Sequence, residues 1–248
     1  MGTRVVAWSA RISWVMIYFV PLFLIIVAFN PVLDTTIYYQ LILATVGTYT
    51  LYELGYIQND TVTIRNETEP TLRLDELQQE YVSDYWLVIL LVRLLIVAIL
   101  LGYLSTAAGF LYYLFSLFLV ALVFPLYNRR RGAINAALHP LLVIARYCGP
   151  LLLVMPEVAV FLYGLLMFPL INGLERARQP RYGLGVLQHL WFADGHSGRW
   201  GYYLLMLVFW SGVCLVLDFA LLTVLPLAYM FVYRLVSPWL IQQMSRAR

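Results

Sequence analysis

Residues 85–104 of the chain read YWLVILLVRLLIVAILLGYL, and residues 108–127 read AGFLYYLFSLFLVALVFPLY. Each run is almost entirely apolar and has the length, about 20 residues, that an α-helix needs to cross the hydrocarbon core of a bilayer. Arg93 is the single charged residue in the two runs. The runs therefore predict a pair of transmembrane helices.

Further apolar segments flank this pair on both sides, at 12–30, 36–57, 137–155, 157–172, 201–218 and 220–237. Pro156 with Glu157 predicts a break in the nearly continuous segment 137–172, because proline cannot continue a helix interior. A turn in the second long segment is expected near Asp218, with Pro226 as a competing kink. We expect an all-α polytopic membrane protein with about eight transmembrane helices, in the range of eight to nine.

The composition supports the same class. Of the 248 residues, 62% are hydrophobic and 12% are charged, whereas a soluble domain has about 45–50% and about 25%. This excludes a soluble enzyme and a disordered chain, and two cysteines, Cys148 and Cys214, are too few for a disulfide scaffold. The net charge of +3 is too small to indicate a nucleic-acid partner. With no internal repeat or linker, residues 1–248 are expected to form a single transmembrane helical domain.

The basic residues, all of them arginine, report the orientation. Arg93 and Arg146 lie inside predicted spans, and the others are assigned to the N-terminal segment, the loops 58–84, 128–136 and 173–200, and the C-terminal end. With eight spans these segments share one side, and the opposite connections carry no arginine. The positive-inside rule makes the arginine-rich side cytoplasmic. We expect an integral protein of a bacterial or archaeal inner membrane, with both termini and the active site on the cytoplasmic side.

The segment with the most candidate functional residues is 52–75, which reads YELGYIQNDTVTIRNETEPTLRLD. Asp60 and Glu67 are seven residues apart and share one face if the helix continues. With Asn59 beside them, two carboxylates are suited to hold Mg²⁺, and Arg65 and Arg73 are suited to pair with phosphate oxygens. A solvated helix end with surface ion pairs is the alternative interpretation.

The stretch from about residue 40 to 75 resembles the second helix and first cytoplasmic loop of the UbiA superfamily of intramembrane prenyltransferases. That family carries an Asn-Asp-x-x-Asp-x-x-x-Asp pattern, and here the pattern reads Asn59, Asp60, Thr63 and Glu67, followed by a turn that ends at Arg73. Thr63 replaces an aspartate and removes one metal-binding charge. The resemblance implies a UbiA-like bundle around a central cavity open to the cytoplasm. It also implies Mg²⁺ at Asp60 and Glu67, catalytic roles for these residues and Asn59, and a phosphate contact at Arg73.

The family's second acidic motif falls in the loop after the sixth span, which here reads NGLERARQPRYGLGVLQHLWFADGHSGRW. Glu175 is its only acid before Asp194, and Arg176, Arg178 and Arg181 surround Glu175. The loop is similar to that of one branch, the polyprenyl-phosphate phosphoribosyltransferases, which have a basic second motif with a single acid. That branch implies transfer of a phosphoribosyl group from phosphoribosyl diphosphate to a polyprenyl phosphate, with these residues as substrate contacts.

Three further residues complete the predicted substrate site. Family members place tyrosine and basic residues in the loop that holds Tyr127 and Arg129, although consecutive arginines also serve as topology anchors. Arg146 lies well inside the fifth span, where a buried arginine needs an acidic partner or a phosphate. Glu53 is the candidate acidic partner, because the family packs its helices around one cavity.

Two other functions remain open from the sequence. One is a conventional UbiA-type prenyltransferase that uses a polyprenyl diphosphate donor, and the other is a non-catalytic membrane scaffold related to the family. Membrane lipids are expected partners in either case. A homo-oligomer is compatible with the small residues along the spans, although the chain has no strong Gly-x-x-x-Gly motif.

Overall fold

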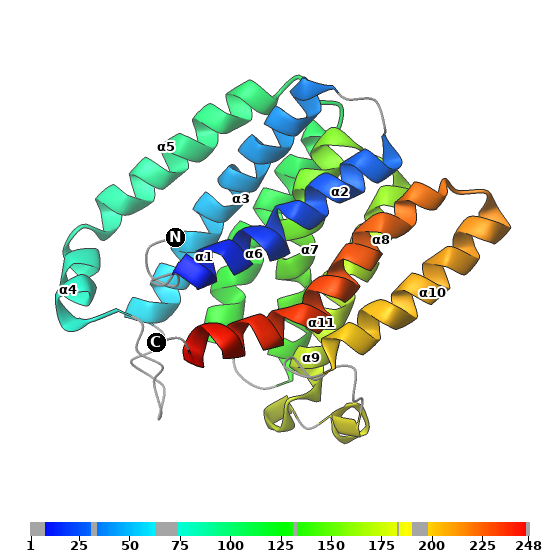
Figure 1. The fold of residues 1–248 in the computed structure, drawn as a ribbon. Coiled ribbons are helices and arrows are strands. Elements are labelled where there is room, and N and C mark those ends of the chain that lie inside the picture. Colours follow the sequence, from blue (N-terminus) through cyan, green and yellow to red (C-terminus); the bar gives the residue numbers. More distant parts are fainter. Residues whose placement is uncertain are drawn as a thin grey trace.

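The computed structural model describes residues 8–30, 34–62, 74–130, 133–182, 184–189 and 198–246, and every regular element within them is helical (Figure 1). The long helices are α1 (Trp8–Tyr18), α2 (Val20–Phe29), α3 (Thr35–Thr61), α4 (Glu76–Asp84), α5 (Trp86–Leu104), α6 (Phe110–Arg129), α7 (Ile134–Val154), α8 (Val158–Met167), α9 (Pro169–Arg178), α10 (Arg199–Leu217) and α11 (Leu225–Arg246). Short 3-10 turns lie at η2 (Pro180–Tyr182), η3 (Gly185–His189) and η5 (Leu221–Val224).

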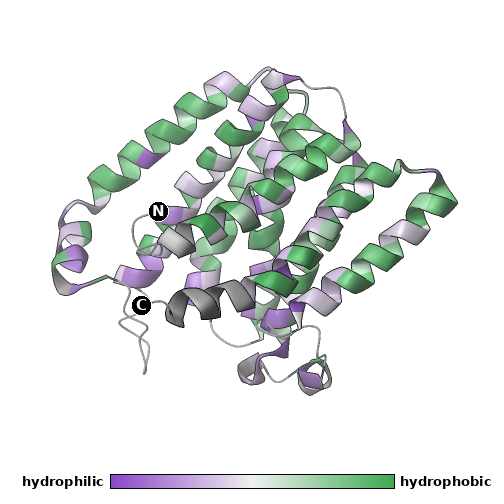
Figure 2. Cartoon of the chain, viewed as in Figure 1, coloured by the Kyte–Doolittle hydropathy of each residue, from purple (hydrophilic) through white to green (hydrophobic). Residues whose placement is uncertain are grey.

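Seven stretches are long and apolar enough to cross a membrane: Ile12–Phe29, Trp86–Leu104, Phe110–Arg129, Ile134–Val154, Val158–Arg178, Arg199–Leu217 and Leu221–Pro238. The protein is therefore a polytopic all-α membrane protein, as predicted. Figure 2 shows apolar residues along most of α5 and α10, and many of their large apolar side chains are exposed. Such surfaces suit contact with lipid.

The predicted span at 36–57 corresponds to α3. The mean hydropathy of α3 is too low for it to count among the seven apolar stretches. Its 27 residues make it about 40 Å long, which is enough to cross a bilayer. Threonine, tyrosine and acidic side chains lower its hydropathy, and many of them are buried because α3 packs against α5, α6 and α7. The count of eight spans depends on this helix and stays a prediction.

Both predicted helix breaks are confirmed. α7 ends at Val154 and α8 begins at Val158, with Pro156 between them. α10 ends at Leu217, and Asp218 adopts a left-handed backbone conformation with φ of 54°, which aspartate tolerates better than most residues. Pro226 lies in the first turn of α11 and does not interrupt the helix.

The polar segments are more helical than the sequence indicated. α3 continues to Thr61, and α4 occupies the end of the predicted loop 58–84. Glu175, Arg176 and Arg178, which were expected in a loop, lie on α9. The predicted end of the span at residue 172 was wrong. α9 follows α8 after a break at Phe168, so the helical span continues beyond its apolar part to Arg178.

Figure 1 shows the lower-left ends of the helices together, including the end of α3, α4, the start of α10 and the end of α11. We call this the basic end, because Arg129, Arg176, Arg178 and Arg199 lie there, at the end of α6, in the last turn of α9 and at the start of α10. The end of α2 and the start of α3, the link between α5 and α6, and the link between α10 and η5 lie at the opposite end. The predicted partition of arginines is therefore reproduced at these positions.

Two glycines let α6 and α7 approach closely. Gly109 donates its N–H to the carbonyl of Leu153 at 2.8 Å, and a Cβ at this position would lie 1.6 Å from the backbone oxygen of Leu152. A Cβ on Gly149 would lie 2.2 Å from the Ser116 hydroxyl. Small residues of this kind allow helix backbones to approach closely in membrane bundles. Here they allow α6 and α7 to pack against each other.

Candidate functional site

The centre of the site is Arg146, in the middle of α7. Its side chain is 9% exposed, and its Nη1 donates to the Tyr56 hydroxyl of α3 at 3.4 Å. Its Nε has no acceptor among the residues that the structure describes. The predicted ion pair with Glu53 does not form, because the α3 groups that surround the guanidinium are tyrosines. Arg146 therefore has no carboxylate partner within the described part of the chain.

Aromatic rings enclose the Arg146 guanidinium. Its central carbon lies 5.1 Å from the ring centroids of Tyr18, Tyr52 and Tyr147, and 6.0 Å from that of Tyr49. Each such contact contributes about 0.5–2 kcal/mol, depending on desolvation. The rings stabilise the charge but do not neutralise it. A buried, uncompensated positive charge is costly, and an anion bound beside it would remove that cost.

One face of α3 connects the tyrosine cluster around Arg146 to Asp60, one of the predicted catalytic residues. Tyr49, Tyr52, Tyr56 and Asp60 are spaced by three, four and four residues, so they lie on the same side of the helix. Asp60 is 2% exposed, and its Oδ1 accepts a hydrogen bond from the Asn59 side chain at 3.1 Å. Asp60 lies one turn, about 6 Å, beyond Tyr56 along the axis. The buried Asp60 carboxylate and the Arg146 guanidinium are thus on the same face of α3.

A second group of site residues connects the tyrosine cluster around Arg146 to the basic end. The Arg176 guanidinium of α9 lies 5.9 Å from the Tyr127 ring of α6, which is 6.2 Å from the His139 ring of α7. Phe124 packs edge-on against both Tyr127 and Tyr56. The fold therefore brings Tyr127 and Arg176, which are far apart in the sequence, to the neighbourhood of Tyr56 and Arg146.

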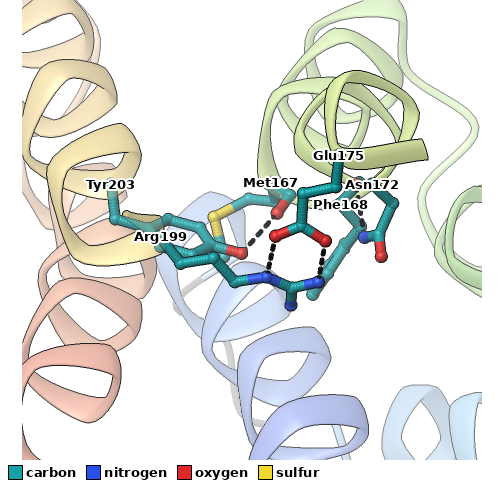
Figure 3. Close-up of polar contacts among 6 residues, drawn as sticks. All are labelled: Met167, Phe168, Asn172, Glu175, Arg199 and Tyr203. Atoms are coloured by element: carbon teal, nitrogen blue, oxygen red, sulfur yellow. Dashed lines mark hydrogen bonds and ion pairs between the residues drawn. The ribbon is translucent and has the colours of Figure 1, made fainter. Parts of the chain in front are cut away.

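Glu175 is engaged in an ion pair. Both of its oxygens accept hydrogen bonds from the Arg199 guanidinium at the start of α10 (Figure 3). Figure 3 also shows the Tyr203 hydroxyl, which donates to the Met167 carbonyl at 3.0 Å. That carbonyl belongs to the last residue of α8, next to the break that precedes α9. The ion pair connects the start of α10 to α9, and the tyrosine connects α10 to the end of α8.

Arg234 is a site residue that sequence reasoning missed. It was counted with the C-terminal end, although it lies inside the predicted span 220–237 and inside the candidate span Leu221–Pro238. Its Nε is buried without a partner, its guanidinium lies 5.8 Å from the Tyr233 ring, and Arg199 is close enough to repel it. The signal that would have found it is an arginine within an apolar window.

The other predicted residues are placed as follows. Arg129 is exposed at the end of α6, and the Arg178 Nε donates to the Gln188 carbonyl at 3.0 Å. Other predicted site residues lie outside the described residues: Arg65, Glu67, Arg73, Asp194 and the side chain of Arg181. Within the described ranges no three His, Cys, Asp or Glu side chains converge on a metal position.

The described site is thus a basic, tyrosine-lined interior with one buried carboxylate at its outer end, and it is suited to hold a multiply charged anion against Arg146. Searches of protein-family models, curated proteins and solved structures found no match to this chain.

Proposed function

We propose that the protein is a Mg²⁺-dependent intramembrane transferase of the UbiA type, which moves a phosphoribosyl group from phosphoribosyl diphosphate to a polyprenyl phosphate. In this proposal α3 is the eighth span, the spans surround one cavity, and the basic end faces the cytoplasm. The observation that carries it is the pairing, on one face of α3, of the buried Asp60 carboxylate with the unneutralised Arg146 guanidinium. A lipid scaffold has no need of a charge that is costly to bury.

The reaction needs charge placement more than proton transfer. An oxygen of the polyprenyl phosphate attacks C1 of the ribose, the bond from C1 to the diphosphate oxygen breaks, and diphosphate leaves with the electron pair. The lipid phosphate is already ionised near neutral pH, so no general base is needed. Arg146 and Arg176 would bind phosphate oxygens and stabilise the charge that develops on the leaving group.

The donor set at the end of α3 fits a hard cation. Asp60 offers a carboxylate and Asn59 an amide next to it, and Mg²⁺ prefers a few carboxylate oxygens together with water and substrate phosphates. Asp60 and Glu67 would hold the ion, which when bound would neutralise the departing diphosphate. Asn59, whose side chain donates to the Asp60 carboxylate, would keep that carboxylate in position.

The proposal is tested with purified protein, Mg²⁺, polyprenyl phosphate and labelled phosphoribosyl diphosphate. We expect label to enter the lipid fraction with the wild type and to fall to background with Asp60→Asn. The matched control is Asp218→Asn, the same chemical change at an exposed position at the opposite end of α10, and it should transfer as the wild type does. Transfer that persists in Asp60→Asn would overturn the assigned role of this carboxylate.

The same assay distinguishes the two alternatives. A prenyl diphosphate donor in place of phosphoribosyl diphosphate would give product if the chain is a conventional prenyltransferase. Thr63, where the family pattern has an aspartate, argues against that reaction. The absence of Mg²⁺-dependent turnover with either donor would favour the non-catalytic scaffold and refute the proposal.

A further inference from the structure

A crevice of about 420 Å³ lies between α3, α4 and α5, and none of its lining residues belongs to the tyrosine cluster around Arg146. Its lining has an apolar part and a polar part. The apolar part consists of Val88, Ile89, Val92 and Ile96, and the polar part consists of Thr50, Tyr81, Tyr85 and Arg93. Seen along α5, the tyrosines lie at or before the first turn and Arg93 lies about 10 Å further on. The crevice is therefore ordered by depth, with the tyrosines outermost.

The guanidinium in this crevice has few partners. Arg93 is half-buried, and its Nη1 donates to the Thr50 carbonyl at 3.3 Å. No carboxylate pairs with Arg93 in the part of the chain that the structure describes. An arginine within an apolar helix extends toward the headgroup region, and its planar fork matches the oxygens of a phosphate.

The outer part of the crevice is suited to a cation. The Tyr81 and Tyr85 rings lie 4.8 Å apart, and the two side chains are 60% and 50% exposed. Glu80 and Asp84 are exposed beside them on α4, a helix that contains no basic residue. Adjacent aromatic rings bind ammonium groups through their faces. The negative carboxylates of Glu80 and Asp84 would also attract an ammonium group.

We propose that this crevice binds the headgroup of a zwitterionic phospholipid. The phosphate lies at Arg93, the ammonium lies outside it at Tyr81 and Tyr85, and an acyl chain continues past Arg93 along Ile96 and the exposed apolar side chains of α5 beyond it. Along α5 the tyrosines come first, Arg93 follows and Ile96 lies deepest, which is the order of amine, phosphate and chain in the lipid. A purely anionic headgroup would place negative charge, without an ammonium, next to Glu80 and Asp84. This lipid site does not depend on the proposed transferase activity.

The test uses the purified full-length protein with equal amounts of phosphatidylethanolamine and phosphatidylglycerol of matched chains, and native mass spectrometry to count bound lipid. We expect the wild type to retain phosphatidylethanolamine several-fold more than phosphatidylglycerol. Arg93→Gln should lower retention of phosphatidylethanolamine several-fold. Tyr81→Leu combined with Tyr85→Leu should abolish the preference between the two lipids.

Arg130→Gln is the charge-matched control, because Arg130 is exposed next to the end of α6, and it should bind lipid as the wild type does. Arg93→Lys keeps the charge and should retain phosphatidylethanolamine. If Arg93→Gln does not fold, Arg93→Lys and the double tyrosine variant test the lipid-binding proposal instead. A wild type that retains phosphatidylglycerol equally well, or an Arg93→Gln variant with unchanged retention, would overturn the proposal.

Discussion

Replacing Arg146 with methionine should affect stability and anion binding in different ways. Methionine fills much of the same space without charge. The change removes cation–π contacts with four rings, each about 0.5–2 kcal/mol, and it also removes the desolvation penalty of a buried ion, which is several kcal/mol. Since these two effects oppose each other, we expect the free energy of unfolding of the ligand-free protein to change by no more than about 1–2 kcal/mol.

Anion binding should weaken much more clearly. A hydrogen bond to a charged group contributes about 1.5–3 kcal/mol, so its loss should raise the Kd for inorganic diphosphate by about 10- to 150-fold. At a concentration of 100 times the wild-type Kd, diphosphate stabilises the wild type by about 2.7 kcal/mol. The same concentration should stabilise Arg146→Met by only about 0.3–1.4 kcal/mol.

Thermal unfolding in detergent, with and without diphosphate and Mg²⁺, measures both quantities. Arg146→Lys is the companion variant, since it keeps the charge but not the planar fork, and it should give intermediate stabilisation. If Arg146→Met loses more than about 3 kcal/mol without ligand, as expected when a buried ion pair is broken, and binds diphosphate as the wild type does, the guanidinium is a structural group and the reasoning is refuted.

Three further changes test the packing around the site, each by the free energy of unfolding in detergent. Glu175→Gln leaves Arg199 without its counter-charge and should cost about 3–5 kcal/mol, most of which a second change, Arg199→Met, should restore; equal losses in the single and double variants would contradict this. Gly109→Ala places a methyl group against a backbone oxygen of α7 and should cost at least about 1–3 kcal/mol, whereas Gly102→Ala, with open space around it, should cost nothing. Tyr203→Phe removes the donor to the carbonyl at the α8–α9 break and should cost about 1 kcal/mol; an unchanged value would show that water replaces the hydroxyl.

The membrane class and the main helix boundaries could be predicted because they depend on local composition. A run of about 20 apolar residues is sufficient to indicate a span, and the breaks at Pro156 and Asp218 follow from proline chemistry and from a polar residue between two apolar runs. α3 was predicted from its pattern although its hydropathy is lower than that of the other spans. Its polar side chains are tolerated because neighbouring helices cover them.

The arrangement of the site could be predicted only in part, because it depends on contacts between distant segments. Arg146 was identified because ionisable residues at membrane depth are rare and costly, and Asp60 was identified from its spacing to Glu67 and from the resemblance to the UbiA motif. That tyrosines from α1, α3 and α7 would surround Arg146, in place of Glu53, could not be read from the sequence. The partner of Glu175, namely Arg199, is 24 residues away on another helix, and only the three-dimensional structure reveals the pair.

The central claim is that the Asp60 carboxylate and the Arg146 guanidinium form one site for a Mg²⁺-bound diphosphate. The most direct measurement is calorimetric titration of the purified wild type and of Asp60→Asn with inorganic diphosphate, with and without Mg²⁺. The account predicts wild-type binding that tightens at least tenfold when Mg²⁺ is added, and no such effect of Mg²⁺ in Asp60→Asn. Wild-type binding of the same strength with and without Mg²⁺, or no binding at all, would contradict it.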